Sequence, residues 1–445
     1  LWLYAQTEYW LNHISKSKKA YRKAMALNPD NDYLQLDYAK ELVDLGDLKQ
    51  ADTIIARLQA RGKNYSAMHI LKARIAFDNG NYNQTNLEAY YALQLDKGNT
   101  EALGLYEKVA QAKAPWLKTG IGYTNDDQPM QTIAPSIEAG IYLHRYAALQ
   151  LGFYSPVFYT NGSFKSAQIF QAGDVTNFSQ IGLLLQANAG VVKYPTNRIS
   201  WLGNLYISKT FIKHLVVEVQ AEEKPYFYTI SSIDSVVNAG HFVFSLGWND
   251  KSTWNGKASF DFNYFNDKNY AYSAYAWLFA PPIKFWKAEL RFGYSYNFSN
   301  ANTSHFVSSE TLAQIISNYA TTQQITGVYT PYFTPNMVQT HSALVSFDME
   351  PIKALSINVH ANIGFYASAQ TPYLYLDNYG GETVIARDYF RNTFWPFNVG
   401  ASLSWQANRA INLSAEYTYT SSYFFSSHYA GLSLKASFLN GKKKK

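Results

Sequence analysis

KAELRFGYSYNF, at residues 287–298, alternates strictly between two kinds of side chain. Every even-numbered position is apolar or aromatic, and every odd-numbered position is polar or glycine. Because successive side chains of a β-strand point to opposite faces of the sheet, this period of two predicts a strand whose faces meet unlike surroundings. The same pattern recurs in residues 257–264, 355–365, 397–405, 411–419 and 432–438.

Further strands of this character are predicted along most of the chain after Pro115. They occupy residues 116–123, 133–143, 147–158, 178–192, 198–211, 215–223, 241–248, 270–279 and 341–348. Many segments reach the roughly 9 to 11 residues that cross a bilayer at a tilt. A soluble sandwich also alternates, but its strands are usually shorter and its buried face is crowded with aliphatic residues. We therefore expect a transmembrane antiparallel β-barrel of roughly 14 to 16 strands, because bacterial single-chain barrels have an even number.

The composition agrees with a chain that meets lipid on one face and water on the other. Aromatic residues make up 17% of the chain and charged residues only 16%, yet the mean hydropathy is slightly negative at -0.25. Lipid-facing apolar residues that alternate with polar ones give such an average, and aromatic girdles at both interfaces supply the tyrosine and phenylalanine. No uninterrupted apolar run reaches the about 18 residues of a membrane-spanning helix, so we expect the chain to span as strands.

The sequence offers few patterns that would carry catalysis or bind a cofactor. Cysteine is absent, which rules out disulfides, thiol nucleophiles and thiolate metal sites. The 9 histidines show no paired metal-ligand spacing, and the sequence contains neither a phosphate-binding glycine loop nor a G-x-S-x-G elbow. The net charge of +6 is not gathered into a basic face, so nucleic acid is not expected as a partner. We expect no enzyme activity, no cofactor and no metal, and we interpret the lysines at 442–445 as a solvated tail.

Residues 1–114 follow a different period. An offset of 34 residues superimposes Ala5, Ala39 and Ala73, and it brings the glycine turn at residues 46–48 onto the one at residues 80–82. Small residues let two helices approach closely, and glycine supplies a turn conformation that other residues resist. A period of 34 with these features resembles the tetratricopeptide repeat, which implies a stack of helix pairs.

The repeat pattern also suggests where the stack begins and ends. Residues 99–113 fit a half-unit that caps the stack, since each unit buries its apolar face only against its neighbours. The first unit already starts inside its first helix at Leu1, so we expect further repeats or a signal peptide upstream. We therefore divide the chain into a helical repeat domain at residues 1–114, shortened at its start, and a barrel at residues 115–445.

Two long segments interrupt the alternation in the barrel. Residues 299–339 are polar and rich in threonine, asparagine and serine, with a short helix predicted near residues 310–319, and residues 367–392 are rich in tyrosine, aspartate and glycine. We expect both as extracellular loops or as plugs, because the periplasmic connections of bacterial barrels are short. The last strand, GLSLKASF at residues 431–438, resembles the closing strand that the barrel assembly machinery recognises in outer-membrane barrels.

The strand phase opposite the apolar side chains predicts a polar inner wall. Both charge signs and several amides occur at this phase, which suits a polar polymer or small hydrophilic solutes. The alternative is that these groups pair with one another and fill the lumen. The candidate lumen-facing residues are Glu218, Gln220, Glu222, Asp261, Asn263, Glu289, Arg291, Asn358, His360, Asn362 and Glu416.

A tetratricopeptide stack joined directly to a C-terminal barrel resembles the outer-membrane exporters of secreted polysaccharides, such as the poly-N-acetylglucosamine and cellulose export porins. The resemblance lies in the domain order and transfers no functional residue. It implies a bacterial outer-membrane protein whose periplasmic repeats recruit envelope proteins while the barrel conducts a polysaccharide outwards. Two alternatives stay open. One is a plugged barrel that anchors the repeats as the scaffold of a larger secretion, motility or surface complex. In that case the concave face of the repeats binds its partners, or the repeats act as a spacer. The other is an outer-membrane hydrolase.

Overall fold

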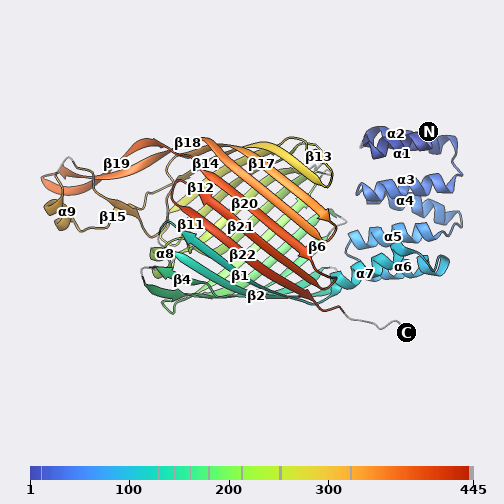
Figure 1. Cartoon of the computed structure of the whole chain (residues 1–445), viewed down its shortest axis with the longest axis horizontal. Coiled ribbons are helices and arrows are strands. Elements are labelled where there is room, and N and C mark those ends of the chain that lie inside the picture. The colour runs from blue at the N-terminus through green and yellow to red at the C-terminus, as the bar shows by residue number, and fades with distance from the viewer. Residues whose placement is uncertain are drawn as a thin grey trace.

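The computed structural model describes residues 1–11, 13–128, 130–144, 146–160, 162–178, 181–211, 214–249, 253–320 and 323–439, so the lysine tail lies outside the described residues. A stack of helices stands at one end of a long β-barrel (Figure 1). None of the helices in the described ranges combines the length and the apolar character needed to cross a bilayer.

Antiparallel helix pairs build the N-terminal stack, and a last unpaired helix joins it to the barrel. The helices are α1 (Trp2–Trp10), α2 (Ile14–Leu27), α3 (Asp32–Asp44), α4 (Leu48–Ala60), α5 (Ser66–Asp78), α6 (Tyr82–Leu95) and α7 (Thr100–Lys113). Gly46 and Gly80 follow α3 and α5 with φ angles of +72° and +67°, the left-handed conformation that glycine adopts without strain. The predicted helical repeats are therefore confirmed.

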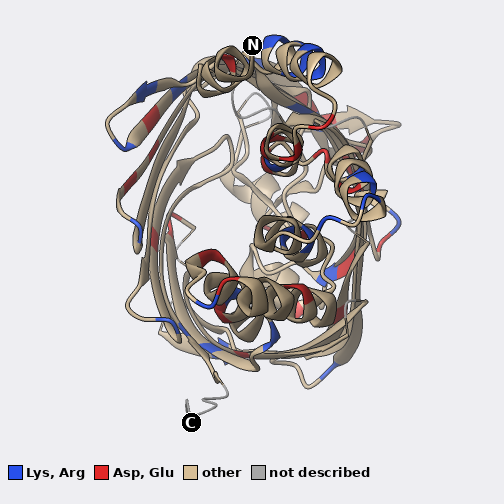
Figure 2. Cartoon of the chain, turned by 90° about the vertical axis from the view of Figure 1, so that its right-hand side faces the viewer, with Lys and Arg blue, Asp and Glu red and all other residues tan. Residues whose placement is uncertain are grey.

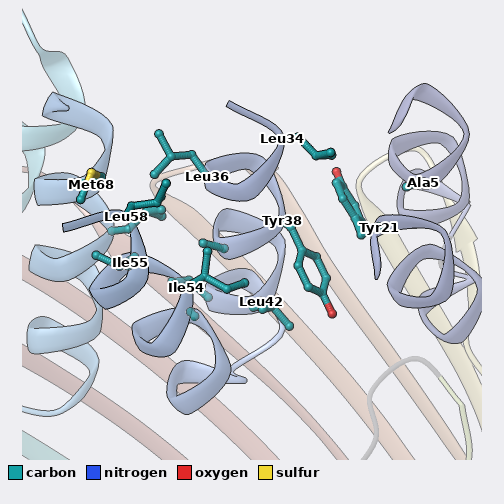
Figure 3. Packing of buried hydrophobic residues seen from close by; sticks show 14 of the residues in the cluster. Ala5, Tyr21, Leu34, Leu36, Tyr38, Leu42, Ile54, Ile55, Leu58 and Met68 are labelled. Carbon is teal, nitrogen blue, oxygen red and sulfur yellow. The ribbon is translucent and has the colours of Figure 1, made fainter. Parts of the chain in front are cut away.

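The three alanines in register at the repeat period lie in the core of the stack. Ala5, Ala39 and Ala73 are each 0% exposed, which allows the helices of neighbouring pairs to approach closely. Larger side chains fill the remaining space, as the stacked rings of Tyr21 and Tyr38 show with centroids 4.9 Å apart (Figure 3). The buried residues form clusters that run from one pair to the next, so each pair is stabilised by its neighbours.

Within the described residues, 16 antiparallel strands close the barrel. They are β1 (Trp116–Asp126), β2 (Gln131–His144), β3 (Ala147–Tyr154), β6 (Gln168–Phe178), β7 (Leu183–Lys193), β8 (Ile199–Thr210), β9 (Leu215–Pro225), β10 (Asn238–Asn249), β11 (Asn255–Phe265), β12 (Tyr270–Phe279), β14 (Ala288–Ala301), β17 (Val338–Ile352), β18 (Leu355–Tyr379), β20 (Phe397–Gln406), β21 (Ile411–Ser421) and β22 (Ser426–Ser437). β1 pairs with β22, with Trp116 opposite Ser437, so the barrel has no free edge. The even strand number agrees with the sequence-based expectation.

Smaller elements decorate the end of the barrel away from the repeats, except for β13, which precedes β14 at the end near the repeats. They are β4 (Val157–Thr160), β5 (Ser163–Ser166), α8 (Ile230–Asp234), β13 (Ile283–Phe285), β15 (Phe306–Ser308), α9 (Leu312–Asn318), β16 (Gly327–Tyr329) and β19 (Glu382–Thr393). The helix α9 lies inside the segment where a short helix is predicted.

The structure corrects the sequence-based expectations at four segments. Residues 168–178 form the strand β6, which the alternation did not predict. Asp174 is in register with the exposed Leu149 of β3, so Asp174 and Thr176 place polar side chains on the outer face, where the pattern expects apolar ones. The strand predicted at residues 178–192 begins only at Leu183, as β7. The strand predicted at residues 147–158 is broken between β3 and β4, where Pro156 lacks an N–H to donate.

The fourth correction concerns residues 367–392, which the sequence predicted as an extracellular loop or a plug. β18 continues to Tyr379 and pairs with β19, and the two strands form a hairpin that extends beyond the barrel wall (Figure 1). Gly380 and Gly381 make its tip with φ angles of +62° and +89°. Tyrosine favours strands and glycine marks the turn, so the composition that suggested a loop belongs to a long hairpin.

A buried carboxylate in the repeat domain shares one hydroxyl group with a backbone carbonyl. Glu41 is 3% exposed, and the Ser17 hydroxyl lies 2.8 Å from Glu41 Oε2 and 2.8 Å from the carbonyl oxygen of Ala5. One hydroxyl hydrogen can be donated to only one of these acceptors. Burial raises the pKa of Glu41. A protonated Glu41 can donate to Ser17, which leaves the hydroxyl hydrogen for Ala5.

Because the folded chain holds this proton more tightly than the unfolded chain, its stabilising effect is present in acid and is lost as pH rises through the folded-state pKa. We expect the helical circular-dichroism signal to melt at a lower temperature as pH rises from about 5 to about 8. Glu41→Gln should flatten this dependence, since its amide can donate to Ser17 at every pH. Glu101→Gln, an exposed control on α7, should keep the wild-type slope. An unchanged slope in Glu41→Gln would show that Glu41 does not carry the effect.

Candidate functional site

The barrel wall has two chemically different faces. On β10, Phe242, Phe244, Leu246 and Trp248 are exposed to between 43% and 46%, whereas Ser245 between them is 2% exposed. In register with Ser245 are Glu218 on β9 and a serine on β11, so the polar phase continues from strand to strand. The exposed apolar phase forms the outer surface of the barrel, and the polar phase faces the interior.

The structure places the candidate lumen-facing residues at the phase of their strands that faces the interior, opposite the exposed apolar phase. These residues are Glu218, Gln220 and Glu222 on β9, Asp261 and Asn263 on β11, Glu289 and Arg291 on β14, Asn358, His360 and Asn362 on β18, and Glu416 on β21. Whether they line a conducting path stays a prediction.

The carboxylates of β9 and β11 contact a lysine and a histidine that the sequence pattern did not single out. Lys257 Nζ lies 2.5 Å from Glu218 Oε2. His241 lies between two carboxylates, with Nδ1 2.8 Å from Glu222 Oε1 and Nε2 3.6 Å from Asp261 Oδ1. Only the strand register brings these residues together, because β9, β10 and β11 place them side by side. The charges of this wall therefore compensate one another.

Other candidate residues also find partners on the wall. Arg291 lies 3.1 Å from Glu289, and Asn358 donates to Asp348 at 2.7 Å. Glu416 accepts a hydrogen bond from the Tyr429 hydroxyl at 2.8 Å. Among the described residues, no group of three or more His, Asp or Glu side chains is arranged to hold a metal ion. Each charged residue of the candidate set named here therefore has a hydrogen-bonding or ionic partner on the wall.

A short segment crosses the mouth of the barrel at the end away from the repeats. We call residues 330–333 the bridge segment. Thr330 lies 2.6 Å from Ser231 of α8, and the Tyr332 ring stacks on Phe265 at the end of β11 with centroids 3.8 Å apart. Tyr332 also donates to Asp267 at 2.8 Å. These contacts attach one end of the bridge segment to the connections around β9, β10 and β11.

The next residue of the bridge segment contacts the other side of the barrel. Phe333 lies 4.9 Å from Phe424 and 5.5 Å from Phe425, ring to ring, in the turn between β21 and β22. In the closed order of strands, β11 and β21 lie nearly opposite each other. Two connections must therefore fold inwards to meet at the bridge segment, and the mouth is spanned by aromatic contacts.

The repeat stack is attached to the opposite end of the barrel. Glu107 of α7 lies 2.7 Å from Arg409 in the turn between β20 and β21. Tyr142 of β2 donates to the Gly80 carbonyl at 3.3 Å and lies 4.9 Å, ring to ring, from Tyr82. Figures 1 and 2 together show the helices standing in front of the barrel opening at this end. Anything that passes through this opening would pass beside the repeats.

A closed barrel with an apolar outer face and a polar inner face, preceded by stacked helix pairs, defines an outer-membrane-type β-barrel protein with a tetratricopeptide domain. The model of the tetratricopeptide repeat family matches residues 14–75. A search of the curated proteins found no match to the chain.

One of the similar solved structures supports the barrel fold. The chain is similar to a structure described as a bacterial polysaccharide outer membrane secretin, with a TM-score of 0.53 and 11% identity over 73% of this chain and 99% of that one. It is also similar to CdiB from Acinetobacter baumannii, with a TM-score of 0.40 and 9% identity over 73% of this chain and 60% of that one. OmpF of Salmonella typhi in complex with daunomycin gives a TM-score of 0.36 and 8% identity over 73% and 97% of the two chains. The first of these likenesses shows a shared fold.

The two-faced wall predicts a depth-dependent cost for charge on the outer face. Phe244 lies near the middle of β10 and Trp248 near its end, and both are exposed. We expect Phe244→Arg to lower the free energy of unfolding in lipid vesicles by about 2 to 4 kcal/mol, and Trp248→Arg by about 0 to 1 kcal/mol. The folded fraction across a urea series, read from heat-dependent gel mobility, measures both. Equal costs at the two depths would contradict a lipid-facing position for Phe244.

Proposed function

We propose that the protein conducts a polar polymer, an exopolysaccharide, across the bacterial outer membrane, with its repeats on the periplasmic side. The observation that carries this proposal is the combination of a closed polar interior with a repeat stack fixed in front of one opening (Figure 2). A polymer that leaves the periplasm would meet the repeats first and the barrel second. The similar secretin is described as a polysaccharide protein, which agrees with this class of cargo.

The lengths of the connections support the orientation. The connections at the end near the repeats are short. β2 ends at His144 and β3 begins at Ala147, and β17 ends at Ile352 and β18 begins at Leu355. At the other end, residues 302–337 and the β18–β19 hairpin form the longest connections of the described barrel. Outer-membrane barrels have short periplasmic turns and longer extracellular loops. This difference in connection length supports the proposed periplasmic position of the repeats.

The chemistry of the wall favours a passing polymer over a tightly bound ion. Conduction requires contacts that are weak and repeated along the path, because a strongly charged wall would hold a counter-charged polymer in place. Glu218 pairs with Lys257 and Glu222 pairs with Lys224, while His241 lies between Glu222 and Asp261. The compensated charges leave hydrogen bonding as the main interaction that the wall offers to a solute.

The repeats offer a surface for periplasmic partners. Tyr33, Tyr90 and Tyr91 are exposed to 68%, 50% and 43% on the helical stack. Tyrosine is enriched at protein interfaces because one side chain combines apolar area with a hydroxyl group. We propose that envelope proteins that modify or deliver the polymer bind this domain.

Conductance across a planar lipid bilayer tests the proposal on the full chain. Because the bridge segment spans the mouth, we expect small or intermittent conductance from the native protein. Replacement of residues 305–333 by a short glycine-serine linker should raise the conductance several-fold. Shortening the hairpin tip at residues 377–384 is the matched control and should leave the conductance at the native level.

Silence of both the native and the bridge-deleted protein, with heat-dependent gel mobility showing a folded barrel, would overturn the export proposal. That outcome would favour the alternative in which a plugged barrel anchors the repeats for a larger assembly.

A further inference from the structure

A cavity of about 440 Å³ lies inside the barrel, towards the end away from the repeats. Inward-facing residues of β12, β14, β17, β18, β20 and β21 form its floor and sides. Two connections cover it: the turn before β20, which contributes Phe394, and the turn between β21 and β22, which contributes Tyr423 and Phe424. A volume of this size falls within the range of about 300 to 1,000 Å³ that is typical of small-molecule sites.

The floor of the cavity carries amide and hydroxyl groups with unused hydrogen-bonding capacity. Asn398 donates to the Thr420 hydroxyl at 2.7 Å. The side-chain amides of Asn297 and Asn362, from β14 and β18, also line the cavity, and neither has a hydrogen-bond partner among the described residues. Each amide offers two donor hydrogens and an acceptor oxygen. The cavity therefore presents several hydrogen-bonding groups to whatever enters it.

The turn that covers the cavity is built to hold its aromatic residues in place. The Ser422 hydroxyl accepts hydrogen bonds from the backbone N–H groups of Phe424 at 3.2 Å and Phe425 at 3.1 Å. Tyr423 donates to the Thr371 hydroxyl of β18 at 2.8 Å. The backbone and one ring of the turn are thus fixed by contacts outside the cavity.

The roof of the cavity is aromatic. The ring of Tyr423 lies 5.3 Å from that of Phe394 and 5.0 Å from that of Phe424, centroid to centroid. Phe333 of the bridge segment packs behind Phe424 at 4.9 Å. These rings give the cavity an apolar wall above a floor of amides and hydroxyls.

Among the described residues that line the cavity, none is Asp, Glu, Lys, Arg or His. The ion pairs of Glu218 with Lys257 and of Glu222 with His241 belong to β9, β10 and β11, and none of these residues lines the cavity. An anionic or cationic ligand would give up part of its hydration in this cavity, which is open to the lumen, without meeting an opposite charge, and this is unfavourable. The lining therefore selects for a neutral ligand that is rich in hydroxyl groups and has an apolar face.

We propose that this cavity is a binding subsite for an uncharged sugar unit of the exported polysaccharide. A pyranose ring has C–H groups on its two faces and hydroxyl groups around its edge. One face would stack on the aromatic roof while the edge hydroxyls bond to Asn297, Asn362 and Asn398. The proposal rests on the proposed function for the presence of a polysaccharide in the lumen, and it adds the position of the subsite and the neutral class of the sugar.

Binding of defined oligosaccharides to the purified full-length protein in detergent tests the subsite without requiring conduction. The probes are cellohexaose as the neutral oligosaccharide, hexagalacturonate as the anionic one and a fully deacetylated chitosan hexamer as the cationic one. Calorimetry gives the dissociation constants, and saturation-transfer NMR shows whether aromatic protein protons lie against the sugar ring. We expect cellohexaose to bind more tightly than either charged probe.

Variants of the roof and floor locate the binding. Tyr423→Ala and Asn362→Ala should each weaken cellohexaose binding by about 3- to 10-fold, whereas Tyr423→Phe, which keeps the ring, should stay within about twofold of the native protein. Tyr379→Ala is the matched control, because Tyr379 is an 81% exposed aromatic residue at the tip of the β18–β19 hairpin. Its binding should equal that of the native protein.

The outcomes separate this proposal from the export function. Binding that the roof and floor variants weaken, in a protein that never conducts, would support the subsite and overturn export. Three results, in a protein that conducts, would overturn the subsite and leave export in place. They are no binding of cellohexaose, equal binding of the charged hexamers, and cellohexaose binding that is unchanged in both Tyr423→Ala and Asn362→Ala.

Discussion

Every backbone N–H and C=O group in the hydrocarbon region of a membrane must be satisfied inside the protein, and the pairing of β1 with β22 meets this requirement. Closure leaves no edge, and it fixes the register of all 16 strands. Because the side-chain period of a strand is two, a fixed register assigns each residue to the lipid or to the interior. The two-faced wall, the ion pairs across β9 to β11 and the neutral cavity all follow from this constraint.

The same constraint explains what can vary. Strand ends lie beyond the hydrocarbon region, so the connections there are free to carry their own structure. The bridge segment uses this freedom, since Tyr332 packs on Phe265 while Phe333 packs on Phe424 from the far side of the barrel. The turn at residues 421–426 must fold inwards to be reached. An inward turn both narrows the mouth and supplies the aromatic roof of the cavity.

Alternation and the repeat period predicted the architecture because both are local properties of the sequence. The spacing of Ala5, Ala39 and Ala73 predicts the stack, and the alternation in stretches such as residues 287–298 predicts the barrel. The strand β6 was not predicted because Asp174 occupies a position where the alternation expects an apolar residue. There its carboxylate accepts a hydrogen bond from the backbone N–H of Ala148 at 2.7 Å. A polar residue that is satisfied by the backbone breaks the pattern without breaking the strand.

The candidate site could be predicted only in part, and the reason is physical. Phase along one strand identifies which side chains point inwards, so Glu222 and Asp261 could be named from the sequence. Their common partner His241 lies on the strand between them and is recognised only once the register is known.

The aromatic roof could not be predicted from the sequence, because Phe394 and Tyr423 lie in turns whose sequence shows no regular alternation of side chains. What joins them is the closed order of strands, in which β20 and β21 are neighbours. The division of the interior into a compensated charged wall and a neutral hydroxyl-rich cavity is therefore a property of the closed barrel, since neighbouring strands contribute to each part. A solute in the lumen would meet both surfaces, and it is the neutral one that combines rings with unpaired amides.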